Sequence, residues 1–359
     1  MSFLSIGDRI GDRYVIQAEV GRGGMQEVYA AVDDTLQRRV ALKVPQDARV
    51  ARRFRESSVI SARVNHPNVA KTLDYFEEDG RFYMVEEIVD GLNLRQVASQ
   101  FTRLDPHAVA YMLHHLARGV AASHRAGVVH RDLKPTNILI GDGLALRSLK
   151  ITDFGIAKMA AGEIDDAVAG GDETTRSSKT AMGALAYMAP EVIESPRTAS
   201  MPADVWAVAA IAWELLTGEP PFRSGLQAVA TILSGKRPAL PRRVSSHVQF
   251  GGLSEQIHEL IMQCFERDPN NRPTAARLAE LCDDICYLTP ARETGAVVNY
   301  PVRSFGFILS DAGETVFFHT QNVIGDGRRP AVGTRVWYTK FDGQPRPRAI
   351  PVLPILANE

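Results

Sequence analysis

The sequence predicts an α+β protein in two parts: a larger one of strands followed by helices, and a small C-terminal β-barrel. Three observations support this prediction. Residues 14–45 alternate between apolar and polar side chains, as β-strands do. The stretch from Asp105 to Ala126 has the pattern of a long amphipathic helix, with Asp105 and Pro106 suited to its first positions. From Gly295 onward, short alternating runs are separated by Gly, Asp and Pro, which is typical of a small barrel.

The composition bounds the number of domains and the kinds of partner. A chain of 359 residues exceeds what a single hydrophobic core usually holds, so we expect more than one domain. The formal net charge of −1 provides no general attraction to nucleic acid or membrane surfaces. The longest apolar run, Val205 to Leu216, is too short and too polar to span a bilayer, and no secretory signal pattern is present. Together with a content of only three cysteines, these features predict a cytoplasmic protein without a membrane partner.

The first strands enclose a glycine-rich turn and are followed by a cation. Gly21, Gly23 and Gly24 lie between two strand patterns, where the absence of Cβ atoms lets backbone N–H groups approach phosphate oxygens. Such a turn is weak evidence by itself. It gains weight from Lys43, which stands in an otherwise apolar strand where an unpaired charge is costly.

A polar loop at residues 128–140 carries the strongest chemical pattern. We expect Val128 and Val129 to form one short buried strand and residues 138–140 another. Between them, Asp132 and Asn137 supply a carboxylate and a carboxamide five residues apart, which suits a proton acceptor beside a metal ligand. A second carboxylate, Asp153, ends a later apolar run within Ile-Thr-Asp-Phe-Gly.

Over roughly residues 10–288, these motifs resemble those of the eukaryotic-type Ser/Thr protein kinases of bacteria. The resemblance implies a bilobal kinase fold within a domain of residues 1–290. A small, mostly-β N-lobe would span about 10–89 and a mostly-α C-lobe about 90–288. Lys-Pro-Thr-Asn after Asp132 matches the serine/threonine version of the loop rather than the tyrosine version.

The resemblance also implies a role for each matching residue, with ATP and Mg²⁺ as cofactors and protein as substrate. Asp132 would accept the substrate hydroxyl proton, and Lys134 would neutralise charge on the transferred phosphoryl group. Asn137 and Asp153 would hold Mg²⁺, and Glu56 would pair with the strand lysine. The implied nucleotide contacts are Gly21, Gly23, Gly24, Val28, Ala41, Lys43, Glu87, Val89 and Leu139.

Four positions depart from the kinase pattern. Gln26 replaces the third glycine of the loop, and Glu56 lies one residue away from its expected place. Glu86 occupies the back of the implied nucleotide pocket, where a buried carboxylate needs a partner. Ala184 replaces a threonine that helps fix the catalytic Asp and Lys. These departures keep open an alternative, a pseudokinase or nucleotide-binding scaffold whose main function lies in the C-terminal barrel.

A long segment rich in acidic and hydroxyl residues, 159–179, corresponds to the activation segment of the family. Arg131, beside the catalytic Asp, would receive a phosphate from this segment, and an unmodified flexible loop is the alternative. We also expect Glu191 to pair with Arg272. The phosphorylation candidates are Thr174, Thr175, Ser177, Ser178 and Thr180.

Residues 291–359 resemble a cold-shock domain, an OB-type barrel, through Arg-Ser-Phe-Gly-Phe-Ile and Val-Phe-Phe-His. The five expected strands are 296–302, 304–309, 314–319, 335–341 and 348–353. A period of two puts three rings and an imidazole on one surface, which the resemblance assigns to single-stranded RNA or DNA. The alternative is that this surface docks on the kinase or on a protein partner. These candidate residues are Phe305, Phe307, Phe317 and His319.

Two features weaken the nucleic-acid interpretation of this domain. Asn299 and Thr320 stand where the cold-shock family has aromatic residues. Residues 292–359 carry eight basic and six acidic side chains, so the electrostatic footprint of the domain is slight.

Overall fold

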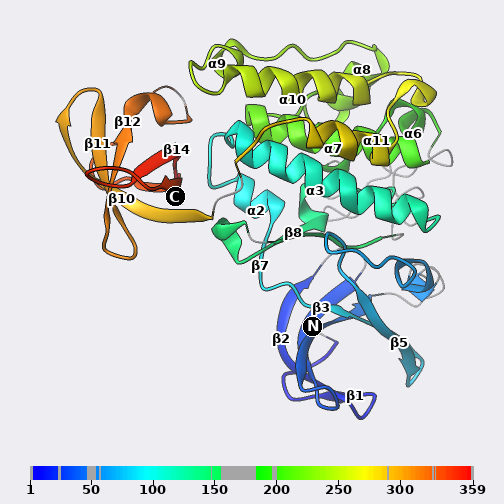
Figure 1. Ribbon diagram of the computed structural model, residues 1–359. Helices are drawn as coiled ribbons and strands as arrows, with labels where there is room; N and C mark the ends of the chain where they lie inside the picture. The colour runs from blue at the N-terminus through cyan, green and yellow to red at the C-terminus, as the bar shows by residue number, and fades with distance from the viewer. Residues whose placement is uncertain are drawn as a thin grey trace.

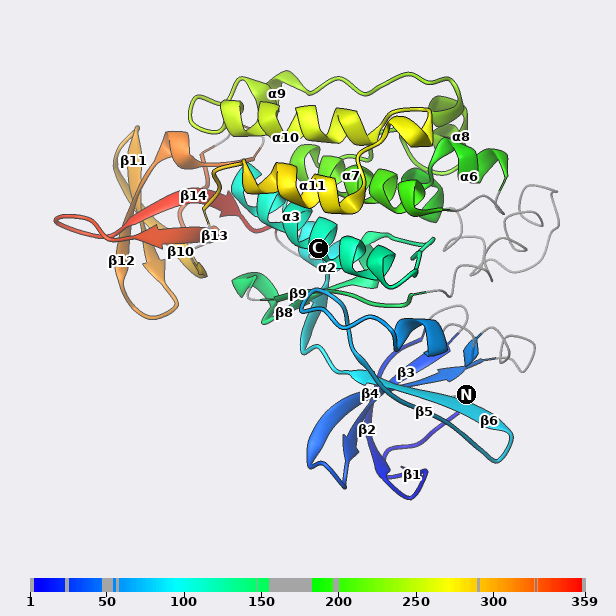
Figure 2. The same ribbon diagram turned by 45° about the vertical axis from the view of Figure 1, so that its right-hand side comes forward.

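The chain forms a strand-rich lobe, a helical lobe and a β-barrel that lies beside the helical lobe (Figure 1). In Figure 2, after a turn of the view, the barrel still adjoins the helical lobe and is well separated from the strand-rich lobe. The computed structural model describes residues 3–22, 26–46, 54–55, 58–146, 148–154, 183–195, 200–288, 291–325, 327 and 329–356.

The strand-rich lobe is a six-stranded antiparallel sheet in the order β1-β2-β3-β4-β6-β5. Its core is formed by alternate residues of these strands, among them Tyr14, Ile16 and Leu42, so the predicted period of two is confirmed. The strands are β1 (Arg9–Ile10), β2 (Tyr14–Arg22), β3 (Gln26–Asp33), β4 (Arg38–Pro45), β5 (Thr72–Glu78) and β6 (Arg81–Glu87). Of the helix expected at residues 51–64, the structure describes 54–55 and 58–64; residues 54–55 and 58–61 are helical, whereas 62–64 are not, so the helix ends earlier than expected. Glu56 lies outside the described residues.

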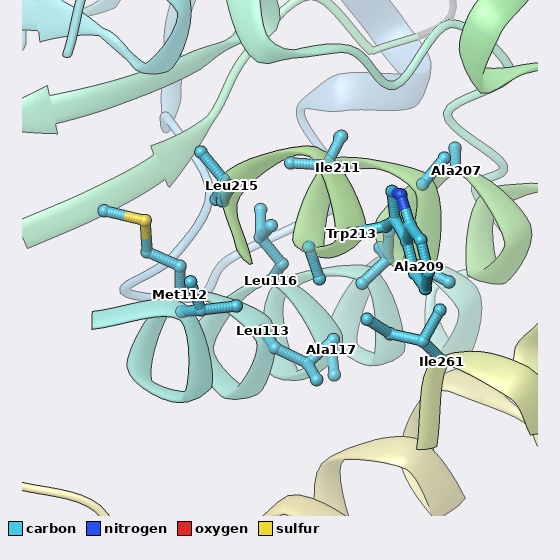
Figure 3. Packing of buried hydrophobic residues seen from close by; sticks show 14 of the residues in the cluster. Met112, Leu113, Leu116, Ala117, Ala207, Ala209, Ile211, Trp213, Leu215 and Ile261 are labelled. Carbon is cyan, nitrogen blue, oxygen red and sulfur yellow. The ribbon is translucent and has the colours of Figure 1, made fainter. Parts of the chain in front are cut away.

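Two long helices form the centre of the helical lobe. α3 starts where predicted, because the Asp105 carboxylate accepts hydrogen bonds from the first free N–H groups and Pro106 needs none. α7 is buried along almost its whole length. Figure 3 shows side chains of α3, α7 and α10 packed together, including Leu116, Ile211 and Ile261. The helices are α2 (Leu94–Ala98), α3 (Pro106–Arg125), α6 (Pro190–Glu194), α7 (Met201–Thr217), α8 (Leu226–Leu233), α9 (Arg242–Ser245), α10 (Gly251–Cys264) and α11 (Ala275–Asp283).

A small sheet lies where the two lobes meet, and it carries the polar loop. Its strands are β7 (Gly91–Asn93), β8 (Ile138–Gly141) and β9 (Ser148–Ile151), in that order. The second expected strand is therefore confirmed as β8. The expected strand at Val128 and Val129 is wrong: both residues lack strand pairing, although Val128 is buried. Short 3₁₀ turns occur at η1 (Pro135–Asn137), η2 (Gly143–Ala145), η4 (Leu185–Tyr187), η6 (Pro269–Asn271) and η7 (Thr320–Asn322).

The C-terminal strands close into a barrel in the order β10-β11-β12-β14-β13. Each of the five expected strands is present, with ends shifted by at most a few residues. An antiparallel barrel is the usual expectation for such short alternating runs, but the closure is mixed, because β12 and β14 pair in parallel at Phe317 and Arg348. The strands are β10 (Arg292–Val302), β11 (Phe305–Ser310), β12 (Thr315–His319), β13 (Arg335–Phe341) and β14 (Arg348–Pro354).

The barrel packs on the helical lobe through a fully buried tryptophan. The indole N–H of Trp337 donates to the Leu144 carbonyl at 2.6 Å, and its ring lies 5.0 Å from that of Phe101. Beside it, Arg292 pairs with Asp105, the residue that caps α3, at 2.8 Å. The hydrophobic core is therefore continuous between the helical lobe and one side of the barrel. No helix in the described part of the chain is long and apolar enough to cross a membrane.

Candidate active site

The polar loop is held by the buried carboxylate of Asp204, near the start of α7. Its two oxygens accept the backbone N–H groups of His130 and Arg131, each at 2.9 Å. The imidazole of His124, at the end of α3, lies 2.8 Å from one of the same oxygens. One carboxylate thereby fixes the backbone immediately before Asp132, so the direction of that side chain is set by the helices of the lobe.

A second set of contacts joins this loop to the segment after β9. His130 Nε2 lies 3.0 Å from the Thr152 carbonyl oxygen, and its ring packs on Phe154 with centroids 4.6 Å apart. The Thr152 N–H donates to the Asn137 carbonyl at 3.0 Å. Asp153, between the two anchored residues, has a positive φ of 64°. The structure therefore brings the two carboxylates predicted from the sequence to one place.

Three polar side chains of the loop contact one another. Lys134 Nζ lies 2.7 Å from Asp132 Oδ2. The Asn137 amide donates to the Asp132 backbone carbonyl at 2.8 Å and to its carboxylate at 3.3 Å. The Asp132 side chain is 20% exposed, so it stays within reach of a substrate hydroxyl. This arrangement offers a proton acceptor, a cation and a carboxamide oxygen within one loop.

Lys43 lies at the centre of a buried polar cluster. Its ammonium group is 2.5 Å from Glu86 Oε2 and 2.8 Å from Asp153 Oδ1. It also donates to Thr152 Oγ1 at 3.0 Å, and that hydroxyl donates to Glu86 at 3.3 Å. The side chains of Lys43 and Glu86 are each only 5% exposed. The cost of burying the lysine, anticipated from its apolar strand, is therefore offset by two carboxylates.

The electrostatics of this cluster shift the pKa values of its two carboxylates, Glu86 and Asp153, in opposite directions. Burial disfavours the charged form of Lys43, but Asp153 and Glu86 outweigh it and raise the pKa of the ammonium group above its ordinary value. Burial also raises the pKa of Glu86, and Lys43 only partly opposes this. For Asp153 the balance is reversed, because Lys43 and Gln26 outweigh burial and lower its pKa. The cluster therefore favours the ionised form of Asp153 more than that of Glu86.

The sequence indicated that Glu86 would be a buried carboxylate in need of a partner, but it did not identify that partner. The partner is Lys43, the lysine that the resemblance pairs with Glu56. The signal was available in the strand register. Ala41 pairs with Glu86, and Lys43 with Met84, so Lys43 and Glu86 are diagonal neighbours on one face of the sheet.

Gln26 also points into this cluster. Its side-chain amide donates to Asp153 Oδ1 at 2.7 Å, and the residue is only 8% exposed. Its Oε1 has no hydrogen-bond partner among the described residues. The sequence predicted a side chain at the tip of the glycine-rich turn. The structure instead places it against the carboxylate implied as a metal ligand.

The implied nucleotide contacts line the region between the strand-rich lobe and β8. Val28 pairs directly with Lys43, and Ala41 lies two residues before it, so all three share one face of the sheet. Leu139 is half-buried on β8, between two fully buried isoleucines. The remaining implied contacts lie around them: Gly21 at the end of β2, and Glu87 and Val89 at the end of and after β6. Gly23 and Gly24 lie outside the described residues.

The substrate side of the site is described in part. Ala184 lines a small depression together with Arg131 and Asp132, so the position that lacks the family threonine does adjoin the implied base. The predicted pair of Glu191 and Arg272 is confirmed, with two hydrogen bonds of 2.7 and 2.8 Å. The five phosphorylation candidates, Thr174, Thr175, Ser177, Ser178 and Thr180, lie outside the described residues.

On the barrel, the predicted sorting of side chains is confirmed. Phe305, Phe307 and Phe317 are half-buried and contact one another, with centroids 5.3 to 6.1 Å apart, whereas the residues between them are buried in the barrel core. His319 pairs with Phe305 across the two strands. The packing of the barrel on the helical lobe involves Trp337 and Leu353 instead. The three phenylalanines, here called the aromatic surface, are thus separate from the docking contacts.

Comparison with known proteins supports the kinase interpretation of this site. The model of the protein kinase domain family matches residues 14–281, and the chain belongs to this family. The match ends before the barrel. A crystal structure of Rad53 residues 1–466 in complex with AMP-PNP is similar to this chain, with a TM-score of 0.56 and 27% identity, covering 74% of this chain and 64% of that one.

Several bacterial proteins named as Ser/Thr protein kinases are similar in sequence. PrkC of Bacillus subtilis is 31% identical over 274 residues, covering 75% of this chain and 40% of its own length. PknL of Mycobacterium tuberculosis is 34% identical over 269 residues, covering 73% of this chain and 63% of its own. The chain thus matches less than two thirds of the length of these relatives.

Proposed function

We propose that this protein is a Ser/Thr protein kinase that transfers the γ-phosphoryl group of ATP to serine and threonine hydroxyls of proteins. The observation that carries the proposal is the meeting of Asp132, Lys134 and Asn137 with Lys43 and Asp153. This set provides a base, two cations and two oxygen ligands at the junction of the lobes, which is what phosphoryl transfer requires.

Each of these residues has a distinct chemical task in the proposed reaction. The Asp132 carboxylate accepts the proton of the substrate hydroxyl as its oxygen forms a bond to the γ-phosphorus, and ADP leaves with the electron pair of the broken P–O bond. The ammonium group of Lys134, 2.7 Å from Asp132, neutralises charge on the group in transfer. Lys43 provides a second cation for the phosphates.

The oxygens of Asp153 and Asn137 fit Mg²⁺, a hard cation that prefers carboxylate and carbonyl ligands. When bound, Mg²⁺ supplies charge neutralisation on the phosphates. The low pKa of Asp153 keeps it available as an anionic ligand. The proposed nucleotide contacts are those of the family loop, strands and hinge: Gly21, Gly23, Gly24, Val28, Ala41, Lys43, Glu87, Val89 and Leu139.

The proposal extends to regulation and organisation. Residues 1–290 form the kinase domain and 291–359 a cold-shock-like domain. Phosphorylation of the segment before Gly183 would supply an anion for Arg131, ordering the site. The reaction uses ATP, and the three free cysteines agree with a reducing, cytoplasmic location.

A phosphotransfer assay tests the proposal. The purified chain is incubated with radiolabelled ATP, Mg²⁺ and a generic basic protein, and the labelled amino acids are identified after hydrolysis. We expect phosphoserine and phosphothreonine, with loss of label in Asp132→Ala and unchanged label in Asp342→Asn, an exposed carboxylate on the barrel. Label that persists in Asp132→Ala would contradict the proposal.

A second function is favoured for the barrel by the aromatic surface. Three mutually contacting, half-exposed rings on one sheet face suit the stacking of unpaired bases, which is typically worth ~1–3 kcal/mol per base. We propose that residues 291–359 bind single-stranded RNA or DNA. Binding of a fluorescently labelled oligonucleotide, measured by anisotropy, tests this proposal. We expect the double variant Phe305→Ala with Phe317→Ala to bind more weakly than the wild type.

The alternative for the whole protein is a nucleotide-binding scaffold without turnover. One observation favours it: the hydrogen bond from Gln26 occupies a carboxylate oxygen of Asp153 that a metal ion would need. The phosphotransfer assay separates the two, because a scaffold binds ATP and transfers no phosphate.

A further inference from the structure

A cleft of about 690 Å³ lies between the helical lobe and the barrel, away from the candidate active site. Four arginines line it, Arg103 and Arg243 from the helical lobe and Arg303 and Arg329 from the barrel. None of the residues described along its wall is Asp or Glu. The positive charge of the cleft therefore comes from both parts of the molecule, and the described part of its lining contributes no carboxylate.

Arg243 is paired with Glu219 at 3.1 Å, whereas the charge of Arg103 is not explained by internal pairing. Arg103 is 6% exposed, and its Nε has no hydrogen-bond partner in the part of the chain that the structure describes. The Nη2 group of Arg103 donates to the Arg243 backbone carbonyl at 3.2 Å. The nearby carboxylate of Asp105 is paired with Arg292 at 2.8 Å. Burial and Arg243 lower the pKa of Arg103 and Asp105 only partly opposes them, so an anion in the cleft would stabilise this buried charge.

The barrel side of the cleft continues from the aromatic surface. Phe307 pairs with Phe317, and Phe305 with His319, at alternate positions along β11 and β12, so the two pairs share one face of the sheet. Immediately beyond this ladder, the Thr320 N–H donates to the Ser304 carbonyl at 2.8 Å. Thr320, which directly follows β12, and Arg303, two residues before β11, line the cleft. The row of rings therefore leads to the edge of the basic cleft.

We propose that this cleft holds the phosphodiester backbone of a single-stranded nucleic acid whose bases stack on the aromatic surface. The inference rests on the proposed nucleic-acid binding of the barrel and adds a second subsite that includes the helical lobe. Arginine is the side chain best suited to phosphate, since its planar fork donates two hydrogen bonds at once. A repeating polyanion fits four arginines spread over two domains, whereas a single phosphorylated side chain would occupy only part of them.

This arrangement explains how a C-terminal domain with little net positive charge could bind a polyanion. Its eight basic and six acidic residues provide little attraction for a polyanion. Docking on the helical lobe adds Arg103 and Arg243 to Arg303 and Arg329 in one cleft. The electrostatic part of the site is thus completed only by the two parts together.

The test measures binding of fluorescein-labelled U₁₂ and dT₁₂ to the full chain by anisotropy, from 50 to 200 mM salt. The test variant is Arg303→Ala with Arg329→Ala, both exposed. The matched control is Arg237→Ala with Arg277→Ala, exposed arginines that pair with Glu266 and Glu280. We expect the test variant to bind about tenfold more weakly at 50 mM salt. Its slope of log affinity against log salt should be lower by about 1.4, since each phosphate contact to a single strand contributes ~0.7.

The outcomes distinguish this inference from the function on which it rests. Weaker binding in Phe305→Ala with Phe317→Ala, together with unchanged affinity and slope in the test variant, overturns the cleft and leaves the aromatic surface. Absence of binding to either oligonucleotide by the wild type overturns both. Binding of a phosphoserine peptide that depends on Arg303 and Arg329, with no competition by either oligonucleotide, also overturns the proposal and assigns the cleft to phosphorylated protein.

Discussion

Lys43 Nζ lies 2.5 Å from Glu86 Oε2, and the two side chains come from adjacent antiparallel strands of the same sheet. The pairing of the lysine is therefore achieved within the strand-rich lobe itself. Because Lys43 also contacts Asp153 at 2.8 Å, the cluster links this sheet to the loop that carries the implied metal ligand. Glu86 thus positions a cation that the proposed reaction needs.

Replacing Glu86 should impair the site more than replacing Glu56. In Glu86→Gln, Asp153 is the one carboxylate partner that Lys43 keeps among the described residues, and the ammonium group is drawn toward it. We expect phosphoryl transfer to fall by about tenfold or more, because losing a hydrogen bond to a charged group costs ~1.5–3 kcal/mol. Glu56→Gln, the matched variant, should keep most of the activity. Steady-state rates with varied ATP measure both, and a larger loss in Glu56→Gln would show that the pair seen here does not serve turnover.

Shortening Gln26 should strengthen the binding of Mg²⁺ with ATP. The Gln26 amide donates to Asp153 Oδ1 at 2.7 Å, so the carboxylate must give up this bond to bind a metal ion. We expect Gln26→Ala and Gln26→Gly to lower the Kd of Mg²⁺–ATP by about three- to tenfold, measured by isothermal titration calorimetry. The alanine variant controls for the added flexibility of glycine. Weaker binding in both variants would mean that Gln26 supports the nucleotide rather than competing with it.

These two contacts show what the sequence could and could not predict. The diagonal relationship of Lys43 and Glu86 follows from the strand register, so it could be derived once both strands were recognised. The direction of Gln26 could not, because a turn residue has no periodicity to fix its side chain. The prediction of a strand at Val128 and Val129 was wrong because an apolar pattern indicates burial but does not identify the hydrogen-bond partners of the backbone. This segment is buried, but its backbone bonds to α3 and to Asp204 instead of a neighbouring strand.

The barrel strands were predicted well because alternation over five to eleven residues is a strong local signal. The parallel pairing of β12 with β14 could not be predicted, because which distant strands pair depends on the geometry of the whole barrel. Docking through Trp337 was also beyond the sequence. A buried tryptophan in a strand pattern indicates a core position, without indicating which core it joins.

Removing Trp337 should release the barrel from the helical lobe. The side chain is fully buried, donates to Leu144 and lies under the Arg292 guanidinium. We expect Trp337→Ala to cost about 3–5 kcal/mol of unfolding free energy and to expose the connection near residue 290 to limited proteolysis. Phe305→Ala, an aromatic residue of the outer surface, is the control and should cost much less. Equal protection of the connection in wild type and Trp337→Ala would contradict this docking.

The folded chain should lose stability as the pH falls from about 6.5 to 4. Burial lowers the pKa of His115 from 6.5 to about 4, with His114, Arg118 and His66 adding repulsion. In this window the unfolded chain binds more protons than the folded one, so the free energy of unfolding decreases as pH decreases. One such group contributes at most about 1.4 kcal/mol per pH unit.

Urea unfolding at a series of pH values measures this dependence. His115→Gln should flatten the decline between pH 6.5 and 4, whereas His319→Gln, on the barrel surface, should leave it unchanged. An identical slope in the wild type and His115→Gln would show that the burial of this imidazole does not control acid sensitivity.

The most direct test of the central claim measures ATP binding and phosphoryl transfer in the same preparations of wild type and Asp132→Asn. If Asp132 is the base of a working kinase, both proteins bind Mg²⁺–ATP with similar Kd. The rate of transfer to a generic basic protein then falls about 10²- to 10⁴-fold in the variant. A wild type that binds Mg²⁺–ATP but transfers phosphate no faster than Asp132→Asn would contradict the claim and identify the protein as a nucleotide-binding scaffold.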